Sequence, residues 1–243
     1  MTDTYRIADK VIRISSLYKD VHDYCVDYRS DGKPDFEVIT TENDILFEKE
    51  KSEKEARIEN KKPVFYSDGY LEELAVYRKI AEKMIDYNII LFHSSVISVD
   101  GQAYAFTAKS GTGKSTHSRL WRELLGERAV MVNDDKPLIR IDDDGVFVYG
   151  TPYCGKHRWG NNICVPLRSI AVIHRSEINH IESTDVPKAF VTLLQQTYRP
   201  SDPVKMAKTL DLLTKMADRV KLYDLYCNME TDAAQTAYNA MKN

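Results

Sequence analysis

The segment "AKSGTGKST" at residues 108–116 constrains the chain more than any other. An alternating apolar segment at 102–107, typical of a strand, precedes it, and an amphipathic segment from about Lys114, typical of a helix, follows. Gly111 and Gly113 allow a sharp turn that brings successive N–H groups close to a ligand. The start of the helix adds unpaired N–H groups and positive partial charge. This strand, loop and helix predict a polyphosphate site in an α/β domain.

The side chains of this segment fit the nucleotide P-loop pattern G-x-x-x-x-G-K-[ST], with Ala108 in place of the first glycine. We expect Lys114 to reach the β- and γ-phosphates of ATP, Ser115 to ligate Mg²⁺ and Thr116 to bond the α-phosphate. The alternative is a flexible surface turn that happens to contain a lysine. The predicted nucleotide-binding residues are Ser110, Gly111, Thr112, Gly113, Lys114, Ser115 and Thr116.

Two adjacent carboxylates, Asp134 and Asp135, follow an apolar segment that is typical of a strand. A P-loop enzyme needs a carboxylate at a strand end to hold Mg²⁺, directly or through water. A second carboxylate can take a proton from an attacking hydroxyl. The alternative is an ordinary turn, because aspartate is common at strand ends. The similar acidic run at 142–144 precedes a glycine between two predicted strands, so it is interpreted as a turn.

The segment "GTPYCGKHRWGNN" at 150–162 concentrates hydrogen-bond donors and an aromatic ring in a non-periodic stretch. Such a loop suits recognition of a polar acceptor. Lys156 or Arg158 can also neutralise charge on a transferring phosphoryl group. The alternative is a structural loop in which Trp159 packs as a lid. The predicted substrate residues are Lys156, His157, Arg158 and Asn162.

The first 88 residues predict a small, mainly β annex followed by a helix. Dense mixed charge at 48–62 indicates a solvated edge or mobile loop. The helix at 70–86 has apolar residues at helical spacing, and Ser67 or Asp68 can cap it. The predicted strands of this annex are 5–14, 36–40 and 44–48.

Residues 89–243 predict the P-loop domain. Two strands between 89 and 108 are joined by a turn at Asp100 and Gly101, a pair favoured in hairpins. We expect Thr231 to cap the last helix. Three further strands are predicted at 129–135, at 136–142 and at a segment ending near 149. A strand pair is predicted at 169–175 and 177–183, and a late strand at 220–227. The other predicted helices are 186–198 and 202–219.

Composition excludes several classes of protein. A net charge of −3 argues against a nucleic-acid binder that relies on bulk positive potential. The apolar stretches are too short for a membrane span, and the N-terminus is not a signal peptide. Neither nucleic acid nor a membrane is therefore an expected partner. The four cysteines, with no C-x-x-C pair, indicate reduced thiols and a cytoplasmic location.

The stretch from His93 to about Arg175 resembles the catalytic domain of HPr kinase/phosphorylase and its smaller stand-alone relatives. The resemblance is carried, in order and spacing, by "HSSVISV", "AFTAKSGTGKST" and "VNDDKPL". It implies the phosphoenolpyruvate carboxykinase-like P-loop fold, an α/β domain with a mixed sheet. The later glycine-rich signature of the full-length family is absent. The segment at 150–167 resembles that of stand-alone relatives linked to small molecules or short peptides.

The resemblance also implies roles for single residues. Asp134 matches the family's catalytic acid/base, and Asp135 and Ser115 match its metal ligands. Lys114 matches the phosphate lysine, and His93 matches a histidine near the catalytic aspartate. Without the resemblance, His93 is interpreted as a packed strand histidine.

Together these features predict an ATP- and Mg²⁺-dependent kinase that transfers the γ-phosphoryl group to a hydroxyl of a small molecule or short peptide. Three alternatives stay open: a protein-serine kinase of the HPr kinase type, a non-catalytic nucleotide-binding regulator, and a phosphoenolpyruvate carboxykinase-like enzyme. The aspartate pair favours an enzyme over a regulator. The acceptor, the choice of ATP over ADP or pyrophosphate, and the oligomeric state stay open.

Overall fold

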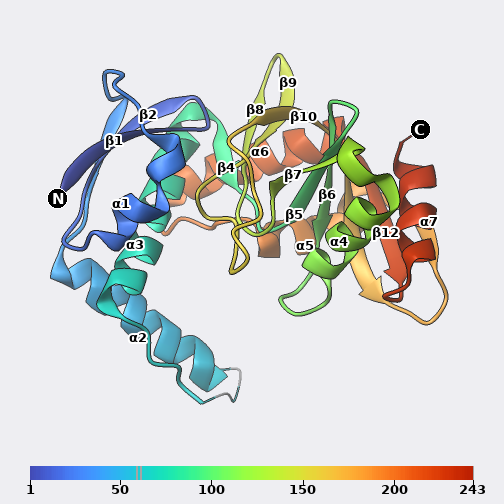
Figure 1. The fold of residues 1–243 in the computed structure, drawn as a ribbon, viewed down its shortest axis with the longest axis horizontal. Helices are drawn as coiled ribbons and strands as arrows, with labels where there is room; N and C mark the ends of the chain where they lie inside the picture. The colour runs from blue at the N-terminus through green and yellow to red at the C-terminus, as the bar shows by residue number, and fades with distance from the viewer. Residues whose placement is uncertain (59, 61, 243) are drawn as a thin grey trace. The chain divides into compact units, whose positions relative to one another are not determined.

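A computed structural model describes residues 1–58, 60 and 62–242. The chain forms two compact units, Met1–Lys83 and Met84–Asn243 (Figure 1). The division falls at the end of a helix, a few residues before the boundary expected between 88 and 89. Short 3₁₀ turns occur at Val26–Tyr28, Ile85–Tyr87 and Gly126–Arg128.

The first unit contains a three-stranded sheet in the order β1-β2-β3. β1 (Thr2–Ile7) and β2 (Lys10–Ser15) form a hairpin, and β3 (Phe36–Ile39) pairs in parallel with β2. The prediction of one strand at 5–14 was wrong, because Ala8 and Asp9 turn the chain with φ values of 48° and 60°. A two-residue turn with two positive φ angles suits a hairpin, and here it lacks the glycine that usually marks it. The strand predicted at 36–40 is confirmed.

Three helices accompany this sheet: α1 (Asp20–Tyr24), α2 (Glu42–Ile58) and α3 (Asp68–Met84). α3 confirms the predicted helix, and the Ser67 hydroxyl accepts the N–H of Tyr70 at its start. The strand predicted at 44–48 was wrong, because it falls in α2. For 48–62, predicted as a solvated edge or mobile loop, a loop was wrong as far as Ile58, where the chain is helical, but most of these helical residues are exposed. Residues 59 and 61 lie outside the described residues. The annex is therefore α+β rather than mainly β.

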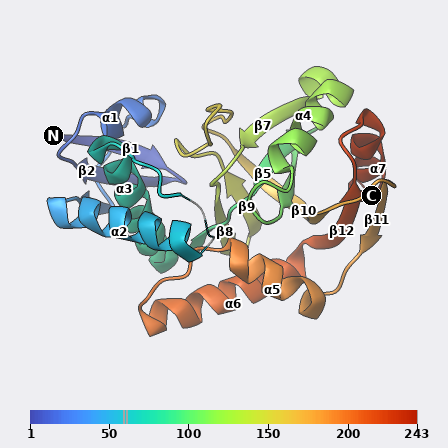
Figure 2. The same ribbon diagram turned by 90° about the horizontal axis from the view of Figure 1, so that it is seen from below.

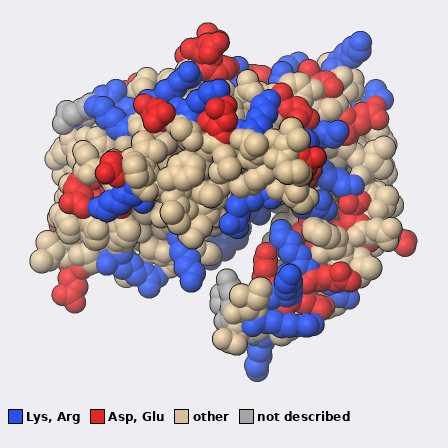
Figure 3. Space-filling view, turned by 180° about the vertical axis from the view of Figure 1, so that it is seen from behind, with Lys and Arg blue, Asp and Glu red and all other residues tan. Residues whose placement is uncertain are grey.

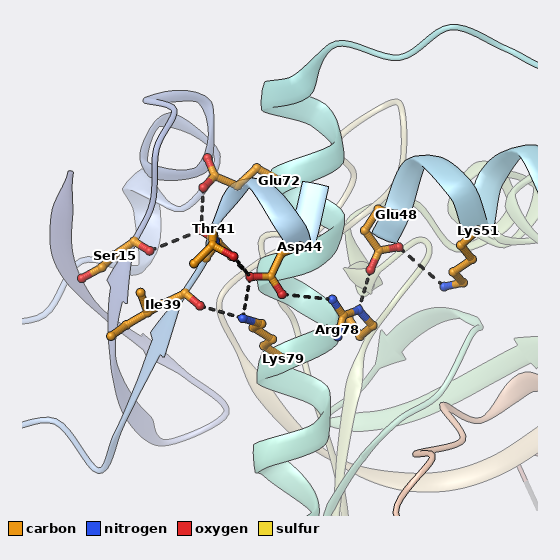
Figure 4. A network of polar contacts seen from close by, with 10 residues as sticks. Ser15, Ile39, Thr41, Asp44, Glu48, Lys51, Glu72, Arg78 and Lys79 are labelled. Atoms are coloured by element: carbon orange, nitrogen blue, oxygen red, sulfur yellow. Dashed lines mark hydrogen bonds and ion pairs between the residues drawn. The ribbon is translucent and has the colours of Figure 1, made fainter. Parts of the chain in front are cut away.

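Ion pairs along one side of α2 explain this helix. Asp44 and Glu48 are one helical turn apart and face α3 (Figure 4). Lys79 Nζ lies 2.8 Å from Asp44 Oδ2, and Arg78 Nε lies 2.5 Å from Glu48 Oε1. Glu48 is buried, so its pairing with Arg78 avoids the cost of an unpaired buried charge. The tertiary pairing thus favours a helix where the local pattern was ambiguous.

The second unit is built on one curled, mixed sheet. The path β4-β8-β9-β10-β6-β5-β7 runs through it, and β12 pairs with both β10 and β11. The strands are β4 (Ile89–Leu91), β5 (Ser95–Val99), β6 (Gln102–Thr107), β7 (Ala129–Asn133), β8 (Leu138–Asp142), β9 (Gly145–Tyr149), β10 (Cys164–Arg175), β11 (His180–Ser183) and β12 (Lys221–Cys227).

The long strand β10 joins two parts of this sheet. Its first residues pair antiparallel with β9, whereas its later residues pair in parallel with β6 and β12. The register to β6 is irregular between Leu167 and Ser169. The predicted direct pairing of 169–175 with 177–183 was wrong, because β12 lies between β10 and β11. A strand from much later in the chain fills that place, which local sequence does not indicate.

Helices cover both faces of this sheet. α5 (Val186–Gln196) and α6 (Pro203–Arg219) lie side by side on one face (Figure 2). α4 (Lys114–Leu125) and α7 (Thr231–Met241) pack on the other, around the buried ring of Trp121. Thr231 is the first residue of α7 and Glu230 its N-cap, without a side-chain cap, so the prediction that Thr231 caps this helix was wrong.

Four strands of the second unit end at the same edge of the sheet. β10 and β12 run parallel to β6. β7 also runs in this direction, because it is antiparallel to β5, which is antiparallel to β6. The glycine loop after β6 and the aspartates after β7 therefore lie at one edge, where β5 also begins. Ligands of open α/β sheets bind at such carboxyl ends.

The surface carries mixed charge. Lys and Arg side chains are interspersed with Asp and Glu side chains over the face drawn in Figure 3. Among the described residues, no helix is both long and apolar enough to span a bilayer.

Candidate functional site

The loop after β6 has the backbone that a phosphate cradle requires. Gly111 and Gly113 adopt φ values of 79° and 130°, and a Cβ atom at either position would meet open space. Backbone conformation rather than crowding therefore favours glycine there. α4 begins at Lys114, with Gly113 as its N-cap. The unpaired N–H groups of the first helical turn consequently lie at the loop.

Lys114 lies folded over the loop. Its Nζ donates a hydrogen bond to the carbonyl oxygen of Ala108 at 3.1 Å, and the side chain is buried. Burial lowers the pKa of Lys114, while the negative charges of Asp135 and Asp134 act in the opposite direction. The ammonium group thus lies within electrostatic range of both carboxylates.

Asp134 is buried, with only 6% of its surface exposed. Its Oδ1 accepts a hydrogen bond from the Ser95 hydroxyl at 2.6 Å, and that hydroxyl lies 2.6 Å from the hydroxyl of Ser118 on α4. Burial raises the pKa of Asp134 above its ordinary value, although hydrogen bonds from Ser95 and Ser115 oppose the rise. The neighbouring charge of Asp135 adds to it.

Asp135 has the opposite shift. Its Oδ1 lies 3.2 Å from Nε2 of His93. Burial acts to raise the pKa of Asp135, but the hydrogen bond from His93 and the charge of Lys136 bring it below the ordinary value. Adjacent carboxylates with separated pKa values commonly divide into a proton-transfer group and a charged ligand. Here the pKa of Asp134 is raised and that of Asp135 is lowered.

Asn133, which the sequence analysis missed, holds the turn that carries both aspartates. Its side chain is fully buried, and its Oδ1 accepts the N–H groups of Asp135 and Lys136 at 2.9 and 2.8 Å. Its Nδ2 donates to the backbone and hydroxyl oxygens of Thr151 at 3.2 and 3.0 Å. The only sign of this role in the sequence is that an asparagine stands directly before the two aspartates. Asn133 thereby links the strand end to the 150–162 segment.

The 150–162 segment packs closely against β7 and the aspartates. A Cβ atom on Gly150 would lie 1.8 Å from the carbonyl oxygen of Asn161. A Cβ atom on Gly155, where φ is +79°, would lie 3.3 Å from the Cβ of Asp135. These glycines are therefore required by close approach or by backbone conformation. His157 and Trp159 stack with ring centroids 5.0 Å apart, and Trp159 packs against the core around α4.

These elements enclose a pocket of about 420 Å³. Most of the predicted site residues line it together. Thr112, Arg158 and Asn162 are not among its lining residues, although all three lie in the described part of the chain. Arg158 is exposed and adopts a φ of 53° in the turn after His157. The lining residues are His93, Ser110, Gly111, Gly113, Lys114, Ser115, Thr116, Asp134, Asp135, Gly155, Lys156 and His157.

Arg175 at the end of β10 is a second residue that the sequence analysis missed. Its guanidinium group donates to the carbonyl oxygens of Gly111 and Thr112, at 3.1 Å for the latter. Arginine suits this task because its fixed fork of donors can bind two oxygens at once. The contact fixes the glycine loop from the side opposite the aspartates. A single arginine at a strand end gives no signal of this role.

The donor set fits Mg²⁺ bound together with a phosphate chain. Among the described residues, no group of three or more His, Cys, Asp and Glu side chains is arranged to hold a metal ion. Mg²⁺ is usually held by one or two carboxylates, substrate phosphates and water rather than by a closed protein cage. The carboxylate of Asp135 and the hydroxyl of Ser115, which line the same pocket, supply oxygen ligands of this kind.

Comparisons with known proteins find matches among solved structures alone. No family model and no curated protein matches the chain. Among solved structures, the chain is similar to the Hpr(Ser) kinase/phosphatase from Coxiella burnetii, with 8% sequence identity and a TM-score of 0.33. The match covers 63% of this chain and 99% of that one. A similarity this low does not establish a shared function, so the functional conclusion depends on the geometry of the pocket.

Proposed function

We propose that the chain is a cytoplasmic kinase that transfers the γ-phosphoryl group of ATP, with Mg²⁺, to a hydroxyl of a small molecule or short peptide. One observation carries the proposal: Lys114, Ser115, Asp134 and Asp135 line the same pocket as the two glycines with positive φ. A phosphate cradle beside two carboxylates of separated pKa is suited to phosphoryl transfer.

The loop and its lysine bind the donor. N–H groups of the loop and of the first turn of α4 bond phosphate oxygens, and the Lys114 ammonium group neutralises charge on the β- and γ-phosphates. Asp135 and Ser115 would hold Mg²⁺. The ion, when bound, offsets the charge that develops on the transferring group. The main contribution of these residues is to position and electrostatically stabilise the reacting groups.

Asp134 receives the proton of the acceptor hydroxyl. Its raised pKa makes it a better base than an exposed carboxylate, and the hydrogen bond from Ser95 fixes its orientation. Lys156 and His157 line the same pocket and are both exposed, which suits contact with a polar acceptor. His93 acts through Asp135, which it orients at 3.2 Å.

The Asp134→Asn variant tests this assignment. Asparagine keeps the shape and the acceptor for Ser95 but cannot take up the proton, so we expect phosphoryl transfer to fall by about 10²–10⁴-fold. Affinity for MgATP should stay within about threefold of that of the wild type. The matched control is Asp143→Asn, which changes an exposed aspartate in the turn between β8 and β9. Full activity of Asp134→Asn would refute the proposed role.

Incubation of the wild type with γ-labelled ATP, Mg²⁺ and pools of metabolites and short peptides identifies the class of acceptor. Labelled metabolites or peptides would support the proposal. Label found only on protein would favour a protein-serine kinase, and bound but intact ATP would favour a nucleotide-binding regulator. Decarboxylation of oxaloacetate at the expense of ATP would favour a phosphoenolpyruvate carboxykinase-like enzyme.

A further inference from the structure

A second pocket, of about 580 Å³, lies on the other side of the glycine loop. It shares Gly111, Gly113 and Thr116 with the first pocket, but neither Asp134 nor Asp135 lines it. The two pockets therefore adjoin at the loop and the first turn of α4. A ligand that passes Thr116 can occupy both of them.

Two turns at the carboxyl ends of β10 and β12 form the outer wall of this second pocket. Asn228 joins them: its N–H donates to Asn179 Oδ1 at 2.9 Å, and its Oδ1 accepts from Asn179 Nδ2 at 3.1 Å. Its Nδ2 also donates to the carbonyl oxygen of Glu177 at 3.3 Å. The wall is thus held in place by hydrogen bonds that involve side chains from both turns.

The lining of this pocket combines apolar side chains with polar ones, which include Arg175 and Glu177. Met229 is 74% exposed, although it is a large apolar side chain, and Ile173 and Cys227 lie beside it in the lining. His117 also lines the pocket; burial lowers its pKa to about 4, so it is neutral at physiological pH. Methionine adapts its shape and makes favourable contacts with aromatic rings. This surface suits a flat aromatic ring system more than a further phosphate.

The order of the groups along a nucleotide, from the γ-phosphate to the α-phosphate and then the nucleoside, relates the two pockets. In the proposed function the γ-phosphate faces Asp134 and the α-phosphate lies at Thr116, one of the residues that line both pockets. The group attached to the α-phosphate must then leave on the side away from the aspartates. That side holds the second pocket.

We infer that the second pocket binds the nucleoside of the donor, with the base against Met229 and Ile173. The inference rests on the proposed function and extends it, because it assigns a place to the nucleoside of the proposed ATP donor, a part that pyrophosphate lacks. Pyrophosphate would fill the loop and leave the surface around Met229 without a contact. The exposed methionine and the hydrogen-bonded wall are then parts of a donor-selecting subsite.

Calorimetric titration of the full chain with MgATP and, separately, with magnesium tripolyphosphate tests this subsite. The wild type should bind MgATP at least about tenfold more tightly than tripolyphosphate. Met229→Ser removes the apolar contact without adding charge and should weaken MgATP binding about fivefold to tenfold, with tripolyphosphate binding unchanged. The matched control is Val204→Ser, which removes another exposed apolar side chain from α6 of the same unit and should change neither affinity.

Equal affinities of the wild type for the two ligands would overturn the subsite and leave the phosphate loop intact. The same holds if Met229→Ser leaves MgATP binding unchanged, or weakens binding of both ligands equally. If the wild type binds neither ligand, the proposed function and the subsite both fail. A thermal melt of each variant checks that the fold is retained.

Discussion

At the scale of single residues, Arg175 is the contact that fixes the glycine loop from outside. It donates to the carbonyl oxygens of Gly111 and Thr112, so its loss leaves the loop amides less ordered. Arg175→Gln should weaken both MgATP and magnesium tripolyphosphate about threefold to tenfold in calorimetric titrations. This differs from Met229→Ser, which should affect MgATP alone.

Arg219→Gln is the matched control for this prediction. Arg219 is also an exposed arginine that donates to a backbone carbonyl oxygen, that of Asp142 on the β8–β9 hairpin. Its substitution should leave the affinities for both ligands unchanged. Equal effects of the two substitutions would mean that Arg175 has no special role at the loop.

A second residue-scale prediction concerns His22 in the first unit. His22 is buried, its Nδ1 lies 2.7 Å from the Tyr5 hydroxyl, and its Nε2 lies 2.9 Å from the Ser16 hydroxyl. Burial lowers the pKa of His22 below its ordinary value of 6.5. The unfolded chain therefore binds this proton at a higher pH than the folded chain does, and the first unit loses stability as pH falls below about 6.5.

Urea denaturation at about pH 7.5 and about pH 5.5 measures this loss. The wild-type midpoint should fall on acidification, whereas His22→Gln, which has no group to protonate there, should show a smaller fall from a lower starting value. An equal fall in both proteins would show that other groups set the pH dependence. His180→Gln, which changes an exposed histidine in the second unit, should behave as the wild type.

At the scale of elements, Asn133 joins the end of β7 to the 150–162 segment. It makes four hydrogen bonds while fully buried, two to the turn that carries the aspartates and two to Thr151. Asn133→Ala should lower the free energy of unfolding by about 2–4 kcal/mol, because it leaves buried N–H and oxygen groups without a partner. Phosphoryl transfer should fall further than MgATP affinity, since the glycine loop is built on a different strand. Chemical denaturation and steady-state kinetics measure the two effects.

The helices, strands and turns also show which features the local sequence could predict and which it could not. The strand, glycine loop and helix around Lys114 were predicted correctly, because glycine positions and apolar spacing are local signals. α2 was not, because its helical state depends on ion pairs from Asp44 and Glu48 to α3. The turn at Ala8 and Asp9 was missed because neither residue is the glycine that such a turn usually carries.

At the scale of the whole molecule, the strand order decides which predicted site residues meet. The sequence predicted Lys114 at the start of a helix that follows one strand and Asp134 at the end of another strand, but only the pairing of β6, β5 and β7 brings the two residues to one pocket. Arg175 and Met229 join the glycine loop through β10 and β12. These pairings link segments far apart in the chain, so no local pattern predicts them.

Hydrogen exchange in the presence of MgATP tests this arrangement over the whole chain. Both pockets are lined only by residues of the second unit, so the amides of Met1–Lys83 should exchange as in the free protein. Magnesium tripolyphosphate should slow exchange at the glycine loop and the aspartates, whereas MgATP should also slow it at the turns after β10 and β12. Protection of those two turns by tripolyphosphate to the same extent would remove the distinction between the phosphate and nucleoside parts of the site.

Strong protection inside the first unit would place part of the nucleotide site there. The segments to follow are 108–117, 133–136, 153–157, 173–177 and 227–229.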